Sequence, residues 1–275
     1  MRDFTAQALL SSSTLQLWDV CCNGSQREES AEESVHATQL VFPYRGIYVR
    51  RVGRDEAVAE ANQMLLFNAE ETYRVSHPVR GGDASMALVI CEPLLRELAP
   101  RALLHGGAVT FRRQRLRIDA RAQALVALLR HSLHRKIAEP LEAESLALTL
   151  VQRALGSRTT HAAGGSVGRQ KLVDRVKLVL ASGLARRWTL AEIAAEVRGS
   201  PVYLTQVFQQ VEGLPLYRYH LRLRLARALD LLPHYDDLTA LSLELGFSSH
   251  SHFSASFRAA YGRSPSAFRQ SALRR

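Results

Sequence analysis

Cysteine and lysine are scarce in this chain of 275 residues, and long apolar runs are missing. The three cysteines, at positions 21, 22 and 91, form no Cys-x-x-Cys pair and are odd in number. The sequence therefore predicts neither a disulfide framework nor a cysteine zinc site. The longest stretch without a charge runs from Phe4 to Trp18 and contains three consecutive serines. It is too short and too polar to span a bilayer, and it has no signal-peptide pattern. We therefore expect a cytoplasmic protein with no membrane association.

Arginine almost completely replaces lysine as the basic residue. The chain has 33 arginines and 3 lysines, and its formal net charge is +10. Apolar residues make up 47% and charged residues 23%, the balance of a folded protein with a core. The charge is uneven: residues 1–170 hold 21 basic and 18 acidic side chains, whereas residues 171–275 hold 15 and 8. This excess favours an anionic partner, most often nucleic acid, for the C-terminal part.

The pattern divides the chain into a β-rich part, a helical pair, a linker and an all-helical part. Residues 1–117 contain short runs rich in β-branched residues, which predict a sandwich or small barrel. The runs are Leu15–Cys21, Tyr44–Val52, Gln63–Phe67, Thr72–Ser76 and Ser85–Cys91. A helical period then predicts two helices within residues 118–155. Residues 156–169 include Gly164-Gly165 and are predicted to be a flexible linker. The basic run Phe111–Arg117 is predicted to be an exposed strand end or loop.

Residues 170–275 show an internal repeat made of helices. Seven segments have the helical period, and Gly or Pro ends them as expected. They are Leu172–Gly183, Thr189–Val197, Pro201–Val211, Pro215–Leu232, Leu238–Leu245, His250–Tyr261 and a last turn from Ser266. An offset of 49 residues superimposes Ser200 on Ser249 and Phe208 on Phe257. Each copy has a short helix, a tight turn at Gly199 or Gly246 and a second helix begun by serine, which is the helix-turn-helix pattern.

The helix between the two copies has a length that suits DNA. At ~1.5 Å per residue, an 18-residue helix from Pro215 to Leu232 is about 27 Å long, and successive major-groove faces lie roughly 34 Å apart. Two recognition helices on one side of a duplex are compatible with this spacer. Its arginines are expected to meet phosphates or acidic neighbours; they are Arg218, Arg222, Arg224 and Arg227. An ordinary helical bundle with a basic, solvated face is the alternative.

Residues 189–271 resemble the DNA-binding domain of AraC/XylS-type bacterial transcription regulators. The resemblance is carried by Ser200-Pro201-Val202-Tyr203-Leu204, by Leu221-Arg222-Leu223 and above all by the run GFSSHSHFSASFRAAYGRSPSAFR from Gly246. It implies an α+β protein whose all-α C-terminal domain has two helix-turn-helix units and binds double-stranded DNA to control transcription. It also implies an N-terminal cupin-like β-barrel for a small effector, a helical pair that forms a homodimer, and contact with RNA polymerase.

Placed on this sequence, the resemblance predicts eleven DNA-contacting residues. They are Val202, Tyr203, Thr205, Gln206, Gln209, Arg222, Ser249, His250, Ser251, Ser254 and Arg258. The family usually has an arginine in each recognition helix where this chain has Gln206 and Ala255. Arginine is the commonest strong reader of guanine, whereas the amide of glutamine suits adenine. The two replacements leave open a second hypothesis, a docking or architectural module with shallow sequence discrimination.

The predicted barrel offers three low-ranking ligand residues, Tyr44, Tyr48 and Arg50, on one face of a single strand from Tyr44 to Arg51. The favoured alternative has Ile47 and Val49 in the core and the arginines in solvent. A metalloenzyme barrel is a third hypothesis, but His36, His77 and His105 are widely spaced and form no His-x-His pair. His131 and His134 fit a solvated helix face or a dimer contact better than a metal. We therefore predict no catalytic residues, no metal site and no cofactor.

Overall fold

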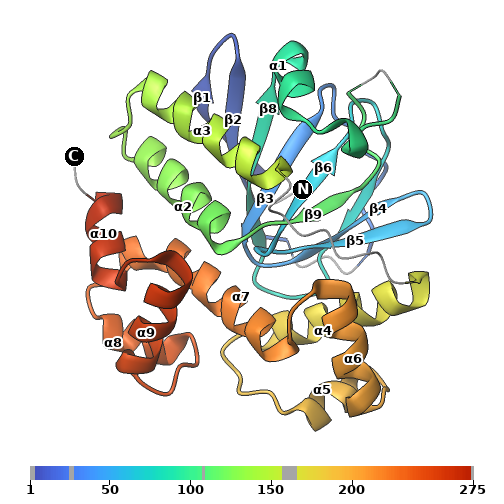
Figure 1. Cartoon of the computed structure of the whole chain (residues 1–275), viewed down its shortest axis with the longest axis vertical. Helices are drawn as coiled ribbons and strands as arrows, with labels where there is room; N and C mark the ends of the chain where they lie inside the picture. The colour runs from blue at the N-terminus through green and yellow to red at the C-terminus, as the bar shows by residue number, and fades with distance from the viewer. Residues whose placement is uncertain (1–3, 25–27, 107–108, 157–165, 274–275) are drawn as a thin grey trace. The chain divides into compact units, whose positions relative to one another are not determined.

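The computed structural model describes residues 4–24, 28–106, 109–156 and 166–273. Its contacts divide the chain into two compact units, Met1–Thr159 with Gln270–Arg275 and Thr160–Arg269. The first unit contains all the described strands and the second is helical (Figure 1), so the α+β class is confirmed. Within the described ranges, no helix is long and apolar enough to cross a membrane. Most of the predicted linker, 157–165, lies outside the described residues.

The strands of the first unit form two sheets. The larger has the order β1-β2-β8-β3-β6-β9 and the smaller the order β5-β4-β7. The bounds are β1 Phe4–Ser11, β2 Leu15–Cys22, β3 Gln39–Arg45, β4 Tyr48–Val52, β5 Asp55–Ala59, β6 Gln63–Phe67, β7 Arg74–Ser76, β8 Asp83–Ile90 and β9 Arg115–Arg117. Among the described strands the two sheets do not join into a closed barrel, so the predicted closed barrel is not present in the described residues.

The predicted single strand from Tyr44 to Val52 is two strands. Gly46 has a φ of 69°, and a Cβ there would lie 2.1 Å from the carbonyl oxygen of Gly82. This left-handed, tightly packed position suits glycine alone, so the chain turns and β3 and β4 enter different sheets. The basic run before residue 118 also differs from the prediction, because Phe111 and Leu116 are buried and β9 lies within it.

Strand alternation gives the larger sheet two apolar faces. Leu40 and Phe42 on β3 belong to a core that includes helices, whereas Val41 between them packs with Tyr48 and Phe67 from the region between the sheets. The helices of this unit are α1 Glu92–Leu98, the short 3-10 helix η1 Arg101–Leu103, α2 Ala120–His134 and α3 Pro140–Leu155. Contacts of α2 with β1 and β3, and of α3 with β9, place the helical pair over one face of this sheet. Most of the apolar stripe of the pair is thus buried or partly buried within the chain, whereas Leu141 at the start of α3 is 76% exposed.

The second unit has the seven predicted helices with slightly different ends. They are α4 Val167–Ser182, α5 Leu190–Glu196, α6 Pro201–Glu212, α7 Leu216–Leu231, α8 Leu238–Glu244, α9 His250–Tyr261 and α10 Pro265–Leu273, with the 3-10 helix η2 Leu232–His234 after α7. The start of α4 at Val167 makes the end of the predicted linker helical. Side chains from α4, α5, α6 and α7 form one core, and buried phenylalanines of α9 and α10 form an aromatic cluster.

Candidate nucleic-acid interface

Two helix-turn-helix units are formed by α5 with α6 and by α8 with α9. The first begins with a capping box, in which Thr189 and Glu192 satisfy each other's backbone N–H groups. Helices α6 and α9 each have 12 residues, and each ends at a left-handed glycine, Gly213 and Gly262, with φ of 70° and 73°. The predicted 49-residue repeat is therefore a structural repeat, which the ordinary-bundle alternative did not require.

The two units differ at their caps and turns. In the second, Ser249 Oγ accepts a hydrogen bond from the backbone N–H of His252 at 3.2 Å, as expected for an N-cap. Ser200 occupies the same position in the first unit but makes no such bond, and Pro201 alone marks the helix start. The left-handed residue of the first turn is Arg198, with φ of 54°, and not Gly199.

Helix α6 buries one face and exposes the predicted contact residues on the other. Leu204 and Phe208 are fully buried, while Val202 and Tyr203 are 66% and 49% exposed. The remaining predicted residues Gln206 and Gln209 are exposed and Thr205 is half-buried. The Thr205 hydroxyl donates to the Val202 carbonyl at 2.8 Å. Two exposed apolar side chains and two amides thus form the outer face of this helix.

Helix α9 repeats the arrangement with a more polar outer face. Its buried residues are Phe253 and Phe257, and the exposed ones include His250, Ser251 and Arg258. Ser254 is half-buried, and its hydroxyl lies 3.3 Å from Nε2 of His250, one turn away. This face offers hydroxyl and imidazole groups that donate or accept hydrogen bonds, with a cation in the last turn.

The arginines of α7 have different roles from one another. Arg218 is exposed and Arg222 half-buried. Arg227 forms an ion pair with Asp230, which confirms the expectation of an acidic neighbour. Arg224 contacts backbone in place of an acid: its guanidinium donates to the carbonyl oxygens of Leu184, Ala185, Arg186 and Gly246 at 2.8–3.1 Å. Arg224 thus connects the loop before α5 to the turn between α8 and α9.

The N-terminal compact unit, which holds the two sheets, contains a cavity of about 570 Å³ between them. Apolar side chains dominate its wall, including Trp18, Val41, Phe67 and Tyr73, and polar ones include Cys22, His77, Asp83 and Ser85. Of the three predicted ligand residues, only Tyr48 lines this cavity. Its phenol is buried, which raises the pKa of Tyr48. A wall of this kind accommodates a small, largely apolar molecule.

Arg50 is fully buried, so the expectation that the arginines of this strand lie in solvent was wrong for Arg50, whereas Arg51 is exposed and Ile47 is buried as expected. Its guanidinium forms an ion pair with Glu71 at 3.1 Å, donates to the Leu66 carbonyl and lies 3.9 Å from the Phe67 ring centroid. Burial lowers the pKa of Arg50, and Glu71 opposes that shift. Arg50 lies behind the cavity wall, where it supports Phe67. The alternation of residues along the strand cannot predict this burial, because the partner carboxylate of Glu71 comes from a later loop.

Tyr44 belongs to a separate cluster that attaches α2 to the sheet. Its hydroxyl donates to Asp19 at 2.6 Å, and the Arg130 guanidinium lies 4.0 Å from its ring centroid. His134 forms an ion pair with Asp19, and His131 is 5% exposed. The buried position of His131 contradicts the expected solvated face, whereas His134 is exposed as expected. These polar groups reach each other only because α2 packs on β2 and β3.

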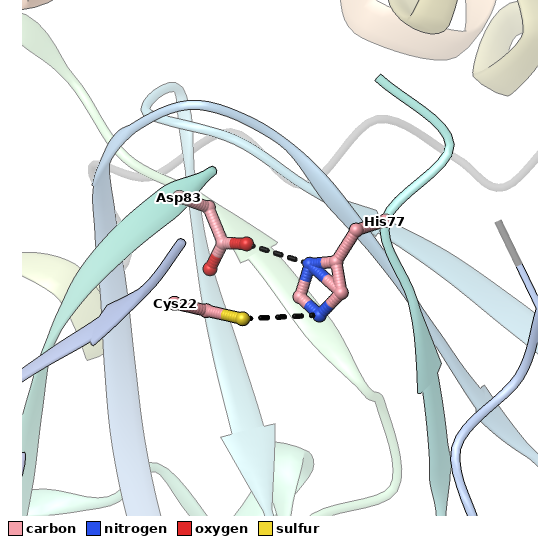
Figure 2. A group of neighbouring side chains, drawn as sticks. All are labelled: Cys22, His77 and Asp83. Atoms are coloured by element: carbon pink, nitrogen blue, oxygen red, sulfur yellow. Dashed lines mark hydrogen bonds and ion pairs between the residues drawn. The ribbon is translucent and has the colours of Figure 1, made fainter. Parts of the chain in front are cut away.

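A cluster that the sequence pattern missed lies at the cavity. Cys22, His77 and Asp83 come together from the end of β2, the segment after β7 and the start of β8 (Figure 2). Asp83 pairs with Cys22 across the two strands. The sequence signals that point to it are the Gly81-Gly82-Asp83 turn and the cysteine that ends the first predicted strand.

Comparisons with known proteins agree with the helical repeat. Residues 172–271 match a family model described as a helix-turn-helix domain. The transcriptional activator RhaR of Klebsiella pneumoniae is 30% identical over 158 residues, which cover 55% of this chain and 54% of that protein. The transcriptional activator RhaS of Escherichia fergusonii is 43% identical over 68 residues, or 24% of each protein. The C-terminal domain is an AraC-type helix-turn-helix domain.

A solved regulator with an AraC-type DNA-binding domain, from Chromobacterium violaceum, is 29% identical. The match covers 39% of this chain and 98% of that one, with a TM-score of 0.37. The chain spans about half the length of RhaR.

The AraC-type domain departs from its family at positions that the structure leaves in solvent. Gln206 and Ala255, which stand where the family usually has arginines, are both exposed. Ser242, the counterpart of Ala194, is fully buried, and its hydroxyl donates to the Thr239 carbonyl at 2.8 Å. The buried departure is therefore satisfied within its own helix. The exposed ones remove two guanidinium groups from the outer faces and leave the core unchanged.

Proposed function

We propose that this protein is a sequence-specific transcriptional regulator whose AraC-type domain inserts α6 and α9 into successive major grooves. The observation that carries the proposal is the structural repeat: two 12-residue helices in register, each ending at a left-handed glycine, with a phenylalanine-containing buried face and an opposite face that exposes most of the predicted contact residues. The eleven predicted contact residues are proposed as the contacts. Helix α7, with 16 residues, joins the two units at a spacing comparable with one turn of DNA.

The polar character of the outer faces sets the proposed mode of readout. The Gln206 amide offers the paired donor and acceptor that read adenine in the major groove. Val202 offers an apolar contact for a thymine methyl group. Exposed Arg258 and half-buried Arg222 are proposed to bind phosphates, which position the domain without reading sequence. We therefore propose that α6 reads A·T base pairs, whereas the binding of α9 depends mainly on phosphate contacts.

The first unit is proposed to hold a small effector in its cavity. Its apolar wall and buried Tyr48 support a ligand of modest size. Binding would alter how the first unit and the residue 156–169 linker hold the AraC-type domain. We further propose that the protein acts in the cytoplasm as a homodimer and that occupancy of DNA changes the recruitment of RNA polymerase. Sedimentation velocity of the full chain tests the dimer.

Fluorescence anisotropy tests the DNA-binding proposal. The full chain is titrated with its own upstream DNA and with a scrambled duplex at several salt concentrations. Specific sites bind ~10³-fold or more tightly than non-specific DNA, and we expect such a gap here. Gln206→Ala should shrink the gap by about tenfold, because a bidentate base contact contributes roughly 1–3 kcal/mol of discrimination. Gln152→Ala, an exposed glutamine on α3, is the matched control and should leave it unchanged.

Equal affinities for the two duplexes, falling together with salt, would contradict sequence-specific recognition. They would favour the second candidate function, a docking or architectural module. The observation that favours it is the absence of a guanidinium at positions 206 and 255. Thr205 bonds to the Val202 carbonyl, and His250 bonds to the Ser254 hydroxyl. These bonds occupy groups that would otherwise be available to bases, which also favours the second candidate function.

A further inference from the structure

The turn before β8 brings together three metal-ligating side chains that are far apart in sequence. Gly82 has a φ of 68°, and a Cβ there would lie 2.4 Å from the Cys22 carbonyl oxygen. The glycine lets the turn pack directly on the end of β2, so Asp83 starts β8 opposite Cys22. His77 enters from the segment after β7, and its imidazole faces both side chains, with Nδ1 toward Asp83 and Nε2 toward Cys22 (Figure 2). The geometry is thus fixed by backbone packing.

The distances within the cluster match those of a metal site. Each residue offers one ligand atom, and these atoms all lie within 4.8 Å of one another. Cys22 Sγ and His77 Nε2 are 3.6 Å apart. Zinc-ligand bonds of ~2.3 Å to sulfur and ~2.0 Å to nitrogen at a tetrahedral angle place the two ligand atoms about 3.6 Å apart. The separation of these two atoms in the structure thus equals that expected for two ligands of one ion.

Asp83 holds the imidazole in the orientation that such an ion requires. Its Oδ2 lies 2.7 Å from His77 Nδ1, so it accepts the Nδ1 proton and leaves Nε2 free on the side of Cys22. Metal-binding histidines almost always donate their second ring N–H to a carboxylate, a carbonyl or water. His77 and Asp83 are 13% and 10% exposed in their side chains, so water competes little for this hydrogen bond.

The charge of the cavity favours a cation over a reactive thiol. Apart from the phenols of Tyr48 and Tyr73, the ionisable side chains on its wall are Cys22, Glu28, Glu33, His77 and Asp83, and neither lysine nor arginine is among the described lining residues. Reactive cysteines lie in electropositive surroundings that stabilise the thiolate. Here the surroundings are acidic, so a bound cation is what would balance the thiolate and carboxylates.

The types of donor atom at the cavity select the kind of cation. Ser85 is 4% exposed, lines the cavity and hydrogen-bonds with the Tyr48 phenol, so its hydroxyl is accounted for within the chain. Sulfur and imidazole donors select zinc-like cations over Ca²⁺ or Mg²⁺, which prefer oxygen alone.

We propose that the cavity of the first unit binds a zinc-type divalent cation through Cys22 Sγ and His77 Nε2, with Asp83 positioning His77. The remaining coordination positions are left for water or for a donor atom of a small molecule in the cavity. A metal ion, or a molecule that coordinates it, is then the signal that this unit detects. The inference does not depend on DNA binding, since its test uses metal alone.

Metal titration of the reduced full chain tests the proposal. Zn²⁺ affinity is measured by competition with a chromophoric chelator, and Co²⁺ is used to detect a thiolate charge-transfer band. We expect one tight site per chain with that band. Cys22→Ser should abolish the band and weaken Zn²⁺ binding at least tenfold. Asp83→Asn should weaken it ~10–100-fold, the usual effect of losing an outer-shell partner. Cys21→Ser and Cys91→Ser are the matched controls and should bind as the wild type does.

Two results would overturn the proposal. One is Zn²⁺ binding that Cys22→Ser leaves unchanged, which would place the metal at surface histidines. The other is rapid alkylation of Cys22 by iodoacetamide that excess Zn²⁺ does not slow, which would favour a free reactive thiol. Because a variant can lose its fold, Zn²⁺-dependent stabilisation is also measured by thermal unfolding. A rise in the midpoint for wild type and Cys91→Ser, absent for a folded Cys22→Ser, supports the site.

Discussion

Gly246 lies in the turn of the second helix-turn-helix unit with a φ of 79°, and a Cβ there would lie 2.0 Å from the Ala185 carbonyl oxygen. Gly262 has nearly the same φ, 73°, but nothing within 4 Å of its added Cβ. Both substitutions to alanine carry the conformational cost of a left-handed residue, roughly 1–2 kcal/mol. Only Gly246→Ala adds a clash with backbone. We expect it to lower the free energy of unfolding by at least ~2 kcal/mol more than Gly262→Ala, as measured by urea denaturation. Equal losses would show that the turn does not need this close approach.

His220 makes the AraC-type domain sensitive to acid. Its pKa is lowered from 6.5 to about 4, mainly by burial and further by Arg224, while a hydrogen bond with the Leu184 carbonyl opposes the shift. The unfolded chain therefore binds a proton near pH 6.5 that the folded chain refuses until about pH 4. Stability falls as pH drops through this window and is unaffected above it.

His220→Gln keeps a donor for the Leu184 carbonyl but does not titrate. Between pH 7 and pH 5 the wild type should lose about 2 kcal/mol more unfolding free energy than the variant, because one pKa unit corresponds to ~1.4 kcal/mol. Urea unfolding at both pH values measures the difference. The same pH dependence in both proteins would show that another group is responsible.

At the scale of elements, a buried ion pair joins α4 to the end of α6. Lys177 is fully buried, and its Nζ lies 2.7 Å from Glu212 and 3.9 Å from Asp174. Removing one partner from a buried pair strands a charge and costs roughly 3–5 kcal/mol, whereas replacing both by apolar residues is often neutral. The pair therefore makes the packing of these helices specific while adding little net stability.

Glu212→Gln should cost ~3–5 kcal/mol, and Lys177→Met with Glu212→Leu should recover most of that loss. The control is Glu92→Gln, which breaks an exposed pair with Arg96 and should change stability by less than about 1 kcal/mol. Urea unfolding followed by far-UV circular dichroism reports on both units, and Trp188 fluorescence in a Trp18→Phe background identifies the transition of the second unit. A double variant as unstable as Glu212→Gln would contradict the stranded-charge explanation.

At the scale of the whole molecule, the positive charge of the second unit is expected to govern how salt affects DNA binding. Arg258 is exposed in the last turn of α9 and is proposed to bind a phosphate. Each phosphate contact contributes roughly one to the slope of log affinity against log salt. Arg258→Ala should therefore reduce the slope by about one and weaken binding to specific and scrambled DNA alike.

Arg121→Ala removes the same charge from an exposed position on α2 in the first unit. Fluorescence anisotropy across a salt series should give this variant the wild-type slope. A comparable change in both variants would mean that net charge, and not a contact at α9, sets the salt dependence.

The sequence by itself determined the elements of the second unit and much of its site. Helical period, caps and glycine stops are local signals, because each depends on residues within a few positions of one another. The repeat at offset 49 then fixed both recognition helices and their exposed faces. It predicted His250–Tyr261 with the same ends as the structure has. The helices of the second unit can be predicted from the sequence because their hydrogen bonds are mostly local.

Only the tertiary structure decided what the first unit holds. Its strands β1, β5 and β9 and helix α1 were not predicted, and one predicted strand proved to be two. Arg50 is buried because Glu71 and Phe67 arrive from other segments. Cys22, His77 and Asp83 meet through strand pairing and a glycine turn. Contacts between distant segments of a sheet depend on register and packing, for which a single sequence carries no local signal.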